Sequence, residues 1–473
     1  MKIHFSINQI SFGTLARLCG GELYPGAVGR MAVEYLCTDS READADTVFV
    51  ALRGERVDGH DFIGAALARG CRCIICEHRT EELAESGASA IVVNDSELAL
   101  SKLANGYRQY LSCLNVGVTG SVGKTTTKDL IASVLSEKHE TFCTSGNHNS
   151  LVGMPLSMLE TPLRSVWSVL EMGMSDFGEI ERLSITAEPQ IAVITNIGSS
   201  HMETLGSREN ICRAKLEILC GLRAGGTLLL SADEPLLENV RGKSYRTLYV
   251  SILRENADFF AKNIRVEPNL TYFDIVWEGG EAKDLCMRIM GRHNVYAALY
   301  AFATGILAGM DVDSIRRGLY AYQPRGMRQN IYDFRDITII EDCYNASPES
   351  MVAAVDVLGE YSRRTGRRSV AVLGTMLALG NDSPALHRKV GEHLPEKKID
   401  RLFTLGQEAD QIAVGARQKG MDSDHIEQNP LVEAPEKTAQ ALLSELKKGD
   451  VVLFKASRAV GMERVIEYLK ERL

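Results

Sequence analysis

Long hydrophobic runs are missing from this sequence: no segment offers the roughly eighteen consecutive apolar residues that a membrane-spanning helix needs. Residues 1–12 also lack the uninterrupted apolar stretch of a signal peptide, because Lys2, His4 and Gln9 interrupt it. An excess of basic residues is missing too, since 62 Asp and Glu outnumber 53 Lys and Arg. We therefore expect a cytoplasmic protein with no nucleic-acid partner and no stable membrane insertion.

The eleven cysteines show no framework of paired metal ligands. Cys71 and Cys73 lie two residues apart, and others, such as Cys113 and Cys143, stand singly. This distribution favours buried, reduced thiols over a structural metal site.

A length of 473 residues with 45% hydrophobic residues is too great for one core and predicts about three units. Short apolar runs typical of strands alternate with helical segments, which predicts an α/β fold. We expect a small α/β unit with a helical connector at 1–110, a central nucleotide-binding α/β unit at 111–322 and a Rossmann-like α/β unit at 323–473. The expected strands are 47–52, 71–76, 90–93, 115–118, 166–170, 191–195, 227–230, 337–340, 369–373, 401–405 and 451–454.

The segment 119–126 contains a glycine-rich loop between an expected strand and an expected helix over 124–139. Backbone N–H groups and the amino terminus of a helix can surround phosphate oxygens at such a turn. Lys124 is expected to hold the β- and γ-phosphates, and the Thr125 hydroxyl to bind Mg²⁺. The expected ATP-binding residues of the loop are Thr119, Gly120, Ser121, Val122, Gly123, Lys124, Thr125 and Thr126.

This loop is shorter than the common P-loop, because Val118 stands where the usual first glycine would be. The short form T-G-x-x-G-K-T resembles the Mur ligase family, which also includes folylpolyglutamate synthases. The segments 144–150 and 153–156 resemble the family motif T-x-G-N-x-N-N…G-x-P-L, with Ser150 in place of the second Asn. The resemblance implies that Asn147 and Asn149 bind the peptide substrate.

Two residues at the carboxyl ends of expected strands carry the resemblance further. Glu171 closes the strand 166–170, and His201 follows the segment Thr195-Asn196-Ile197-Gly198. The carboxyl edge of such a sheet is where ligands gather. The resemblance implies that Glu171 and His201 bind Mg²⁺, and that Lys215 is N-carboxylated and adds a negative charge beside the metal. A plain helix-surface lysine is the alternative for Lys215.

Motifs in the last third of the central unit and in the third unit resemble the family's nucleotide and peptide sites. Gly291-Arg292-His293-Asn294 resembles the segment near adenine, Arg328 an arginine that reaches back to the nucleotide, and 342–348 the motif D-x-Y-N-A-x-P. By resemblance, Asn294, Arg328 and Asp342 bind ATP. Peptide-substrate contacts are implied for Tyr344, Asn345, Lys455 and Ser457.

The first unit resembles the UDP-binding domain of Mur ligases. Folylpolyglutamate synthases lack such a domain. The matching segments are 38–41, 49–54 and 58–62. The implied UDP-substrate contacts are Thr38, Ser40, Arg41, Arg53, Gly54, Asp58 and His60.

Four further positions depart from the family pattern. Ala297 stands where an Asn is usual, Thr375 and Ala378 replace an Asp and a Glu, and Ala456 replaces the Gly of Lys-Gly-Ser. These changes put one base contact, dipeptide recognition and closure of the third unit in question.

The D-x-Y-N-A-x-P motif implies the branch that joins D-alanyl-D-alanine to UDP-N-acetylmuramoyl-tripeptide, giving a peptidoglycan precursor. We therefore expect an ATP- and Mg²⁺-dependent carbon–nitrogen ligase that acts as a monomer through an acyl phosphate. The third residue of the tripeptide, diaminopimelate or lysine, stays open. The alternatives are another ligase of the family, either amino-acid-adding or polyglutamylating, and a nucleotide-regulated binding protein without ligase activity.

Overall fold

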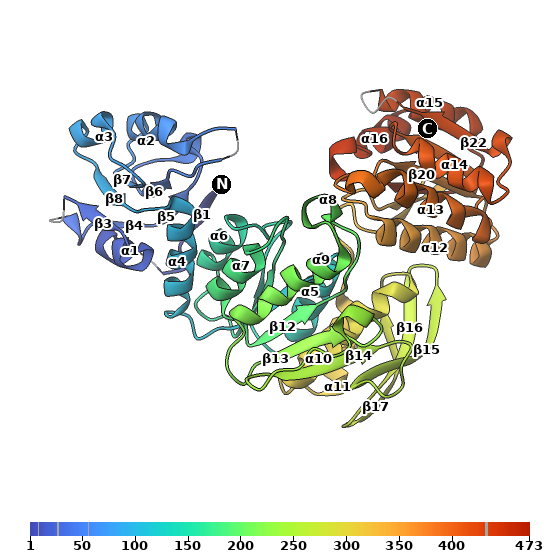
Figure 1. Ribbon diagram of the computed structural model, residues 1–473, viewed down its shortest axis with the longest axis horizontal. Coiled ribbons are helices and arrows are strands. Elements are labelled where there is room, and N and C mark those ends of the chain that lie inside the picture. The colour runs from blue at the N-terminus through green and yellow to red at the C-terminus, as the bar shows by residue number, and fades with distance from the viewer. Residues whose placement is uncertain (8, 26–27, 55, 431–433) are drawn as a thin grey trace.

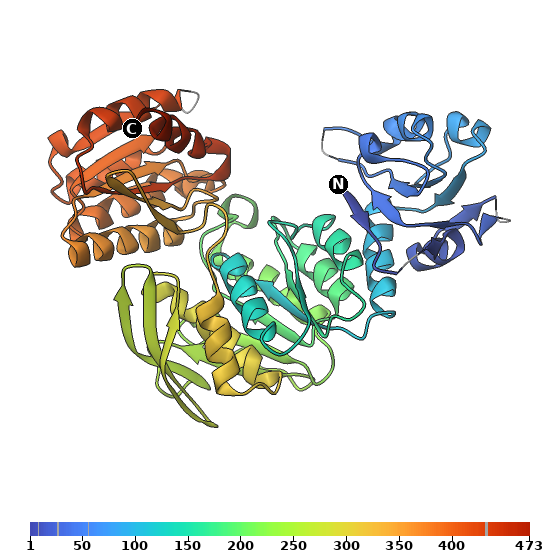
Figure 2. The same cartoon turned by 180° about the vertical axis from the view of Figure 1, so that it is seen from behind.

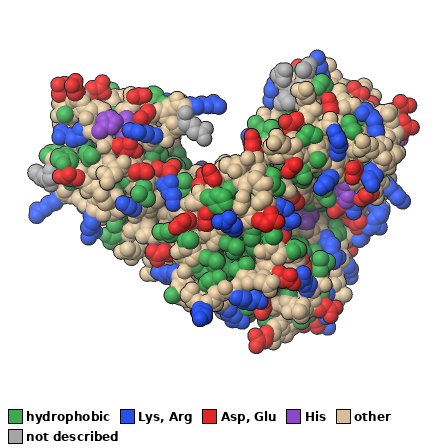
Figure 3. All heavy atoms as spheres, viewed as in Figure 1, with side chains coloured by type: hydrophobic (Ala, Val, Ile, Leu, Met, Phe, Trp, Pro, Cys, Tyr) green, Lys and Arg blue, Asp and Glu red, His purple; other side chains and the backbone are tan. Residues whose placement is uncertain are grey.

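The computed structural model describes residues 1–473 except 8, 26–27, 55 and 431–433. Within these residues the chain forms three large sheets, each with its own helices. The first and third units stand on opposite sides of the central one (Figures 1 and 2). The space-filling view is hollowed between them, above the central unit (Figure 3). This arrangement confirms the predicted α/β class.

The first sheet has the order β1-β5-β6-β7-β8-β3, with four inner parallel strands and two antiparallel edges. Its strands are β1 (Lys2–His4), β3 (Glu22–Tyr24), β5 (Tyr35–Cys37), β6 (Thr47–Val50), β7 (Cys73–Cys76) and β8 (Ser89–Val92), and β2 (Ile10–Ser11) pairs with β4 (Ala32–Val33). Its helices are α1 (Phe12–Cys19), α2 (Ile63–Ala68), α3 (Glu81–Glu85) and α4 (Ser96–Arg108).

The connector helix α4 fastens the first unit to the central one. Its apolar side belongs to a hydrophobic core that runs without a break from Phe5 into Met154 and Leu183 of the central unit. Arg108 pairs with Glu188 at 2.6 Å, and the Asn105 amide donates to the Ile185 and Thr186 carbonyls. The shared core and these polar contacts make the two units one packed body.

The central sheet has the order β10-β11-β9-β12-β13-β14-β15-β16-β17. Helices cover both faces, because its neighbouring parallel strands are buried and need crossover helices. The strands are β9 (Leu114–Thr119), β10 (Thr141–Cys143), β11 (Trp167–Glu171), β12 (Ile191–Ile194), β13 (Thr227–Ser231), β14 (Arg246–Ser251), β15 (Phe259–Glu267), β16 (Leu270–Trp277) and β17 (Gly280–Met287). The helices are α5 (Lys124–Leu135), α6 (Gly153–Leu159), α7 (Glu179–Ala187), α8 (Met202–Leu205), α9 (Arg208–Leu216), α10 (Val295–Leu307) and α11 (Val312–Ala321).

Several elements of the central unit differ from the sequence-based expectations. Strands β10 and β14 and an antiparallel meander, β15 to β17, extend the sheet where we predicted no strands. Helix α5 ends at Leu135 instead of 139, because residues 136–140 (Ser-Glu-Lys-His-Glu) offer no apolar side chain to continue its buried face. The sequence pattern predicts one helix over 208–222, but helix α9 ends at Leu216, and residues 217–220 tighten into a 3₁₀ turn.

The third sheet has the order β18-β19-β23-β20-β21-β22, parallel except for β18. Its strands are β18 (Asn330–Phe334), β19 (Ile337–Glu341), β20 (Ser369–Gly374), β21 (Arg401–Leu405), β22 (Ile426–Asn429) and β23 (Val451–Lys455). Its helices are α12 (Pro348–Thr365), α13 (Ser383–Glu396), α14 (Asp410–Gln418), α15 (Pro435–Glu445) and α16 (Glu463–Arg472). The predicted boundary at 322/323 lies between α11 and β18, and that at 110/111 lies between α4 and β9; both stay predictions.

In the part of the chain that the structure describes, no helix combines the length and apolar character needed to span a bilayer.

Candidate functional site

The glycine-rich loop connects β9 to α5, as the sequence predicts, and a neighbouring segment braces it. Val122 N donates to the Asn196 side-chain oxygen at 2.9 Å, and Gly198 N donates to Ser121 Oγ at 2.9 Å. Gly120 has φ +145°, and a Cβ there would lie 1.8 Å from Thr195 Oγ1, so no other residue fits without moving the brace. The loop is therefore held open in a shape that leaves the amino terminus of α5 facing a cavity.

Glu171 meets the loop from the adjacent strand. Because β9 and β11 are parallel neighbours, their carboxyl ends lie at one edge of the sheet. The Thr125 hydroxyl donates to Glu171 Oε2 at 2.7 Å, and Asn149 Nδ2 donates to Glu171 Oε1 at 2.8 Å. The carboxylate is buried, with 2% of its surface exposed. The structure thus joins three of the sequence-predicted residues in one hydrogen-bonded group.

Burial and neighbouring positive charge shift the pKa values of three basic side chains, Lys124, His201 and Lys215. Burial, and then the charges of Lys124 and Lys215, lower the pKa of His201 to about 4. Burial and Lys124 hold the pKa of Lys215 well below its usual range. Burial also lowers the pKa of Lys124, an effect that Glu171 opposes and Arg328 strengthens. Burial disfavours the charged form of each group, and neighbouring positive charge adds to this effect, which favours an anion in this region.

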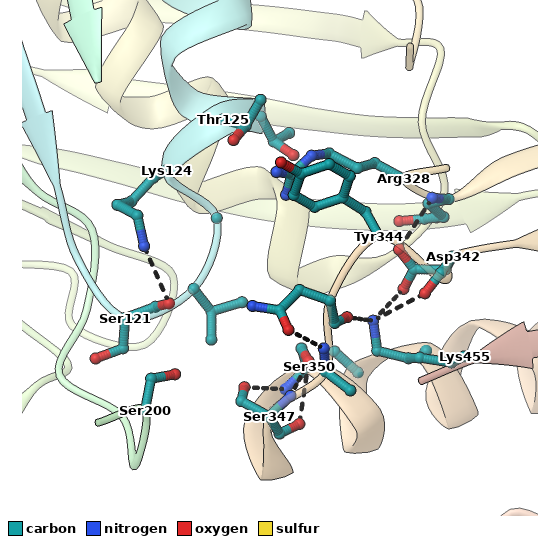
Figure 4. Close-up of a pocket in the computed structure, with 18 of the residues that line it drawn as sticks. Ser121, Lys124, Thr125, Ser200, Arg328, Asp342, Tyr344, Ser347, Ser350 and Lys455 are labelled. Carbon is teal, nitrogen blue, oxygen red and sulfur yellow. Dashed lines mark hydrogen bonds and ion pairs between the residues drawn. The ribbon is translucent and has the colours of Figure 1, made fainter. Parts of the chain in front are cut away.

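The third unit supplies the opposite wall of the cavity (Figure 4). The Arg328 guanidinium lies 3.9 Å from the centre of the Tyr344 ring, which stacks on it. Lys455 Nζ donates to Asp342 Oδ2 at 2.7 Å and to the Asn345 carbonyl at 3.1 Å. The cavity holds about 410 Å³, is lined by both units, and includes Asn147 in its wall.

Some predicted residues are engaged elsewhere. Asn294 donates to the Met290 carbonyl and to the side-chain oxygen of Gln329, both at 2.9 Å, although it lines the cavity. Ser457 accepts from Leu377 N at 3.0 Å and is buried. Thr119 is buried behind the loop. For these three residues a direct ligand contact stays a prediction.

The structure adds wall residues that the sequence analysis did not select. Ser347 and Ser350 form a capping box at the start of α12, and this S-x-x-S spacing before an apolar helix was the available signal. Ser200, Gln329 and Arg458 carried no recognisable local pattern. Their places depend on how the units pack.

Several of the positions that depart from the family pattern have defined surroundings in the structure. The Ala456 methyl group lies against Gly374, where a Cβ would come within 2.6 Å of it. Thr375 is buried, and its backbone N–H donates to the Leu405 carbonyl at 3.1 Å. Ser150 Oγ accepts from the backbone N–H of Gly153, the first residue of α6, at 3.1 Å. Ala297 lines a second cavity of about 260 Å³ behind the loop.

The residues predicted to bind UDP lie in the first unit, apart from the cavity. Thr38, Ser40 and Arg41 follow β5, whereas Arg53, Gly54, Asp58 and His60 follow β6, so all seven lie at the carboxyl ends of neighbouring parallel strands. His60 is buried: Nδ1 contacts Asp58 at 2.6 Å, and Nε2 accepts from Glu77 N at 2.9 Å. Its ring therefore connects Asp58 with Glu77, and a contact with UDP stays a prediction.

The same three units appear in the comparison with known families. Residues 32–108 match the model described as "Mur ligase family, catalytic domain", residues 118–305 the Mur ligase middle domain, and residues 327–458 "Mur ligase, glutamate ligase domain".

Individual relatives are similar to this protein over nearly the whole length of the chain. The UDP-N-acetylmuramoyl-tripeptide--D-alanyl-D-alanine ligase of Bacillus subtilis (strain 168) is 38% identical over 97% of both chains. A crystal structure of MurF from Acinetobacter baumannii superposes with a TM-score of 0.89 at 29% identity, over 99% of this chain and 100% of that one. The structure of MurF ligase from Thermotoga maritima in complex with ADP has a TM-score of 0.81 at 32% identity, over 92% and 97%. The glycine-rich loop, the buried Glu171 and the opposing third unit thus occur in a chain that belongs to the Mur ligase family.

Proposed function

We propose that this protein is an ATP-dependent ligase that joins D-alanyl-D-alanine to UDP-N-acetylmuramoyl-tripeptide, giving the pentapeptide precursor of peptidoglycan, ADP and phosphate. One observation carries the proposal: a single cavity unites a phosphate-binding loop with Asp342, Tyr344, Asn345 and Lys455 of the opposing unit. The names of relatives that match over nearly the full chain support the same substrates.

The chemistry requires activation of a carboxylate. An oxygen of the tripeptide's terminal carboxylate attacks the γ-phosphorus of ATP, the bond to the β,γ-bridging oxygen breaks, and ADP leaves. The amine of D-alanyl-D-alanine then attacks the acyl carbonyl, loses a proton, and expels phosphate as the amide forms. Both steps bring anions together or expel one, so positioning and positive charge supply most of the catalysis.

The residues of the central unit would perform the first step. The backbone N–H groups of 120–126 and the amino terminus of α5 would hold the phosphates, and Lys124 would neutralise the γ-phosphoryl oxygens. Arg328 enters from the third unit beside Tyr344, so it would reach the nucleotide only when that unit is docked. Asn294 and Asp342 complete the proposed nucleotide contacts.

The donor set beside the loop fits Mg²⁺. The Thr125 hydroxyl and the Glu171 carboxylate are hard oxygen donors 2.7 Å apart, and we propose that His201 is a further ligand. Bound there, Mg²⁺ would offset the charge that grows on the phosphoryl oxygens.

Lys215 fits this set only after a change in its charge. As an ammonium it would repel a cation, but its depressed pKa favours the neutral amine. A neutral amine attacks CO₂ and releases a proton, which gives a carbamate with negative charge. We propose that Lys215 is N-carboxylated in the active enzyme and completes the metal site with Thr125, Glu171 and His201.

The remaining substrate contacts would divide between the units. The loops after β5 and β6 would hold the UDP end, Asn147 and Asn149 the peptide, and Tyr344, Asn345, Lys455 and Ser457 the dipeptide. Docking of the third unit would exclude water, which otherwise hydrolyses the acyl phosphate. We further propose that residues 1–110, 111–322 and 323–473 are the functional units of a cytoplasmic monomer.

The test combines phosphate release with mass measurement of the product. The purified protein is supplied with ATP, Mg²⁺ and UDP-N-acetylmuramoyl-tripeptide, with or without D-alanyl-D-alanine, and Lys124→Ala is the control. We expect pentapeptide only when the dipeptide is present and only from the wild type. Turnover only with a different amine would show that the protein is a ligase of this family with another substrate. ATP binding without any turnover would show that it is a regulatory binding protein and not a ligase.

A further inference from the structure

One carboxylate of the third unit is bonded to the segment that braces the phosphate loop. Glu349 is the second residue of α12, and its Oε1 accepts from Ser199 N and Ser199 Oγ, both at 2.8 Å. The two residues are 150 positions apart in the chain. Two hydrogen bonds to a carboxylate are stronger than neutral ones, so this is a specific contact between the units.

Further contacts connect Ser199 and its neighbour Gly198 to the phosphate loop. A Cβ on Gly198 would lie 2.9 Å from the Glu349 carboxyl carbon, so glycine allows the close approach. Gly198 N in turn donates a hydrogen bond to Ser121 Oγ, and Val122 N donates one to the side-chain oxygen of Asn196. The chain of contacts from Glu349 through Ser199 and Gly198 to Ser121 therefore ties the position of the third unit to the shape of the phosphate loop.

The second oxygen of the Glu349 carboxylate, Oε2, is not used in the contact with Ser199. Glu349 Oε2 is buried and has no hydrogen-bond partner among the described residues. The Glu349 residue belongs to the wall of the 260 Å³ cavity that lies behind the loop, together with Thr126, Asn294 and Ala297. A buried acceptor without a donor is unfavourable, and an occupant that brings an N–H or O–H group relieves this cost.

We propose that Glu349 couples docking of the third unit to the nucleoside part of the nucleotide. Oε1 holds the unit on Ser199, and Oε2 accepts a hydrogen bond from a hydroxyl or amino donor of the nucleoside in the 260 Å³ cavity. Glu349 is thus a nucleoside-binding and positioning residue. Docking of the third unit therefore depends on the nucleoside as well as on the phosphates. The inference rests on the proposed ATP-dependent function.

Three variants separate the two oxygens. Glu349→Gln keeps an acceptor for Ser199 but turns the other position into a donor. Ser199→Ala removes one of the two bonds to Oε1 and leaves Oε2 unchanged. Glu349→Ala removes both functions. Glu467→Gln, on the exposed side of α16, is the matched control for a change of charge in the third unit.

Calorimetry with two probes, ATP and inorganic tripolyphosphate, tests the nucleoside contact. We expect Glu349→Gln to weaken ATP binding about tenfold, as for loss of one hydrogen bond to a charged group, and to leave tripolyphosphate binding unchanged. Ser199→Ala should leave ATP affinity within about twofold but lower kcat, because docking is loosened. Glu349→Ala should show both effects, and Glu467→Gln neither. The thermal unfolding midpoint of each variant shows whether it is folded.

Analogues identify the donor: 2′-deoxy-ATP and 3′-deoxy-ATP each lack one ribose hydroxyl, and purine riboside triphosphate lacks the amino group. For the analogue that lacks the donor, wild type and Glu349→Gln should bind equally. Equal weakening of ATP and tripolyphosphate by Glu349→Gln, or no weakening of ATP, overturns the proposal. The binding data are read without turnover, so failure of this inference is distinct from failure of the wild type to form pentapeptide.

Discussion

The Thr125 hydroxyl donates a hydrogen bond of 2.7 Å to Glu171 Oε2, which ties the first turn of α5 to the end of β11. The two residues are far apart in the sequence, but the parallel pairing of β9 and β11 brings the carboxyl ends of these two strands together. The pair offers two oxygen donors at the point where the phosphate loop opens. The proposed Mg²⁺-dependent chemistry is expected to depend on this contact.

Glu171→Gln should lower kcat on the order of 100-fold, because it removes the negative charge that draws Mg²⁺ to this place. The amide has the shape of the carboxylate and can still accept from Thr125, so the free energy of unfolding should change by only about 1 kcal/mol. The measurement is phosphate release as a function of Mg²⁺ concentration, where the half-saturating concentration should rise. Glu471→Gln, at an exposed site on α16, is the control, and an unchanged Mg²⁺ dependence would refute the assignment.

Lys215→Ala should be inactive and regain activity when a short carboxylic acid such as acetate is added, since the acid can replace the carbamate. Lys215→Arg should be inactive without rescue, because a guanidinium stays charged and fills the space. The wild type incubated with ¹³C-bicarbonate should give a carbamate signal in the NMR spectrum that is missing from Lys215→Ala. Lys243→Ala, an exposed lysine, should retain both signal and activity. A wild type without a carbamate signal argues against the modification.

Gly120→Ala should abolish nucleotide binding, because its Cβ would lie 1.8 Å from Thr195 Oγ1 and the brace would have to move. Gly178→Ala is the matched control: Gly178 also has a positive φ, +81°, but nothing lies within 4 Å of the added Cβ. The control should cost about 1 kcal/mol of stability and keep ATP affinity. ATP titration calorimetry and thermal unfolding measure both quantities, and similar ATP affinities for the two variants would contradict the role of the brace.

His387 should make the stability of the third unit fall in acid. Its Nε2 accepts from Met376 N at 2.9 Å and its Nδ1 donates to the Ser383 carbonyl, so the buried ring is neutral, and burial lowers its pKa below the usual value. Below about pH 6.5 the unfolded chain takes up a proton that the folded ring resists, so the free energy of unfolding decreases as the pH falls. Above that pH the contribution is fully present.

The variant His387→Gln isolates this effect, because an amide oxygen can replace the acceptor without titrating. Its free energy of unfolding, measured with urea at about pH 7.5 and about pH 5.5, should fall less than that of the wild type. Equal losses in the two proteins would show that the pH dependence arises elsewhere.

Local patterns predicted the phosphate loop and strands β6–β9, β11–β13, β19–β21 and β23, because a buried strand, a glycine turn and a helix with one apolar face are short-range signals. Strands β1–β5, β10, β14, β18 and β22 were not predicted. Segments without such signals were missed. The meander β15 to β17 mixes polar and apolar residues on bent strands, with register shifts at Lys262/Arg265 and Phe273/Ile275 that disturb a regular alternation.

Composition and periodicity along the chain predicted the α/β class and the three units, and short motifs gave the candidate site residues through the family resemblance. Which of these residues meet depends on the tertiary structure. Contacts such as Glu349 with Ser199 and Lys455 with Asp342 join residues more than one hundred positions apart. They arise from the packing of whole sheets and units, where the energy of each contact depends on every surface that is buried with it, and no local pattern encodes that sum.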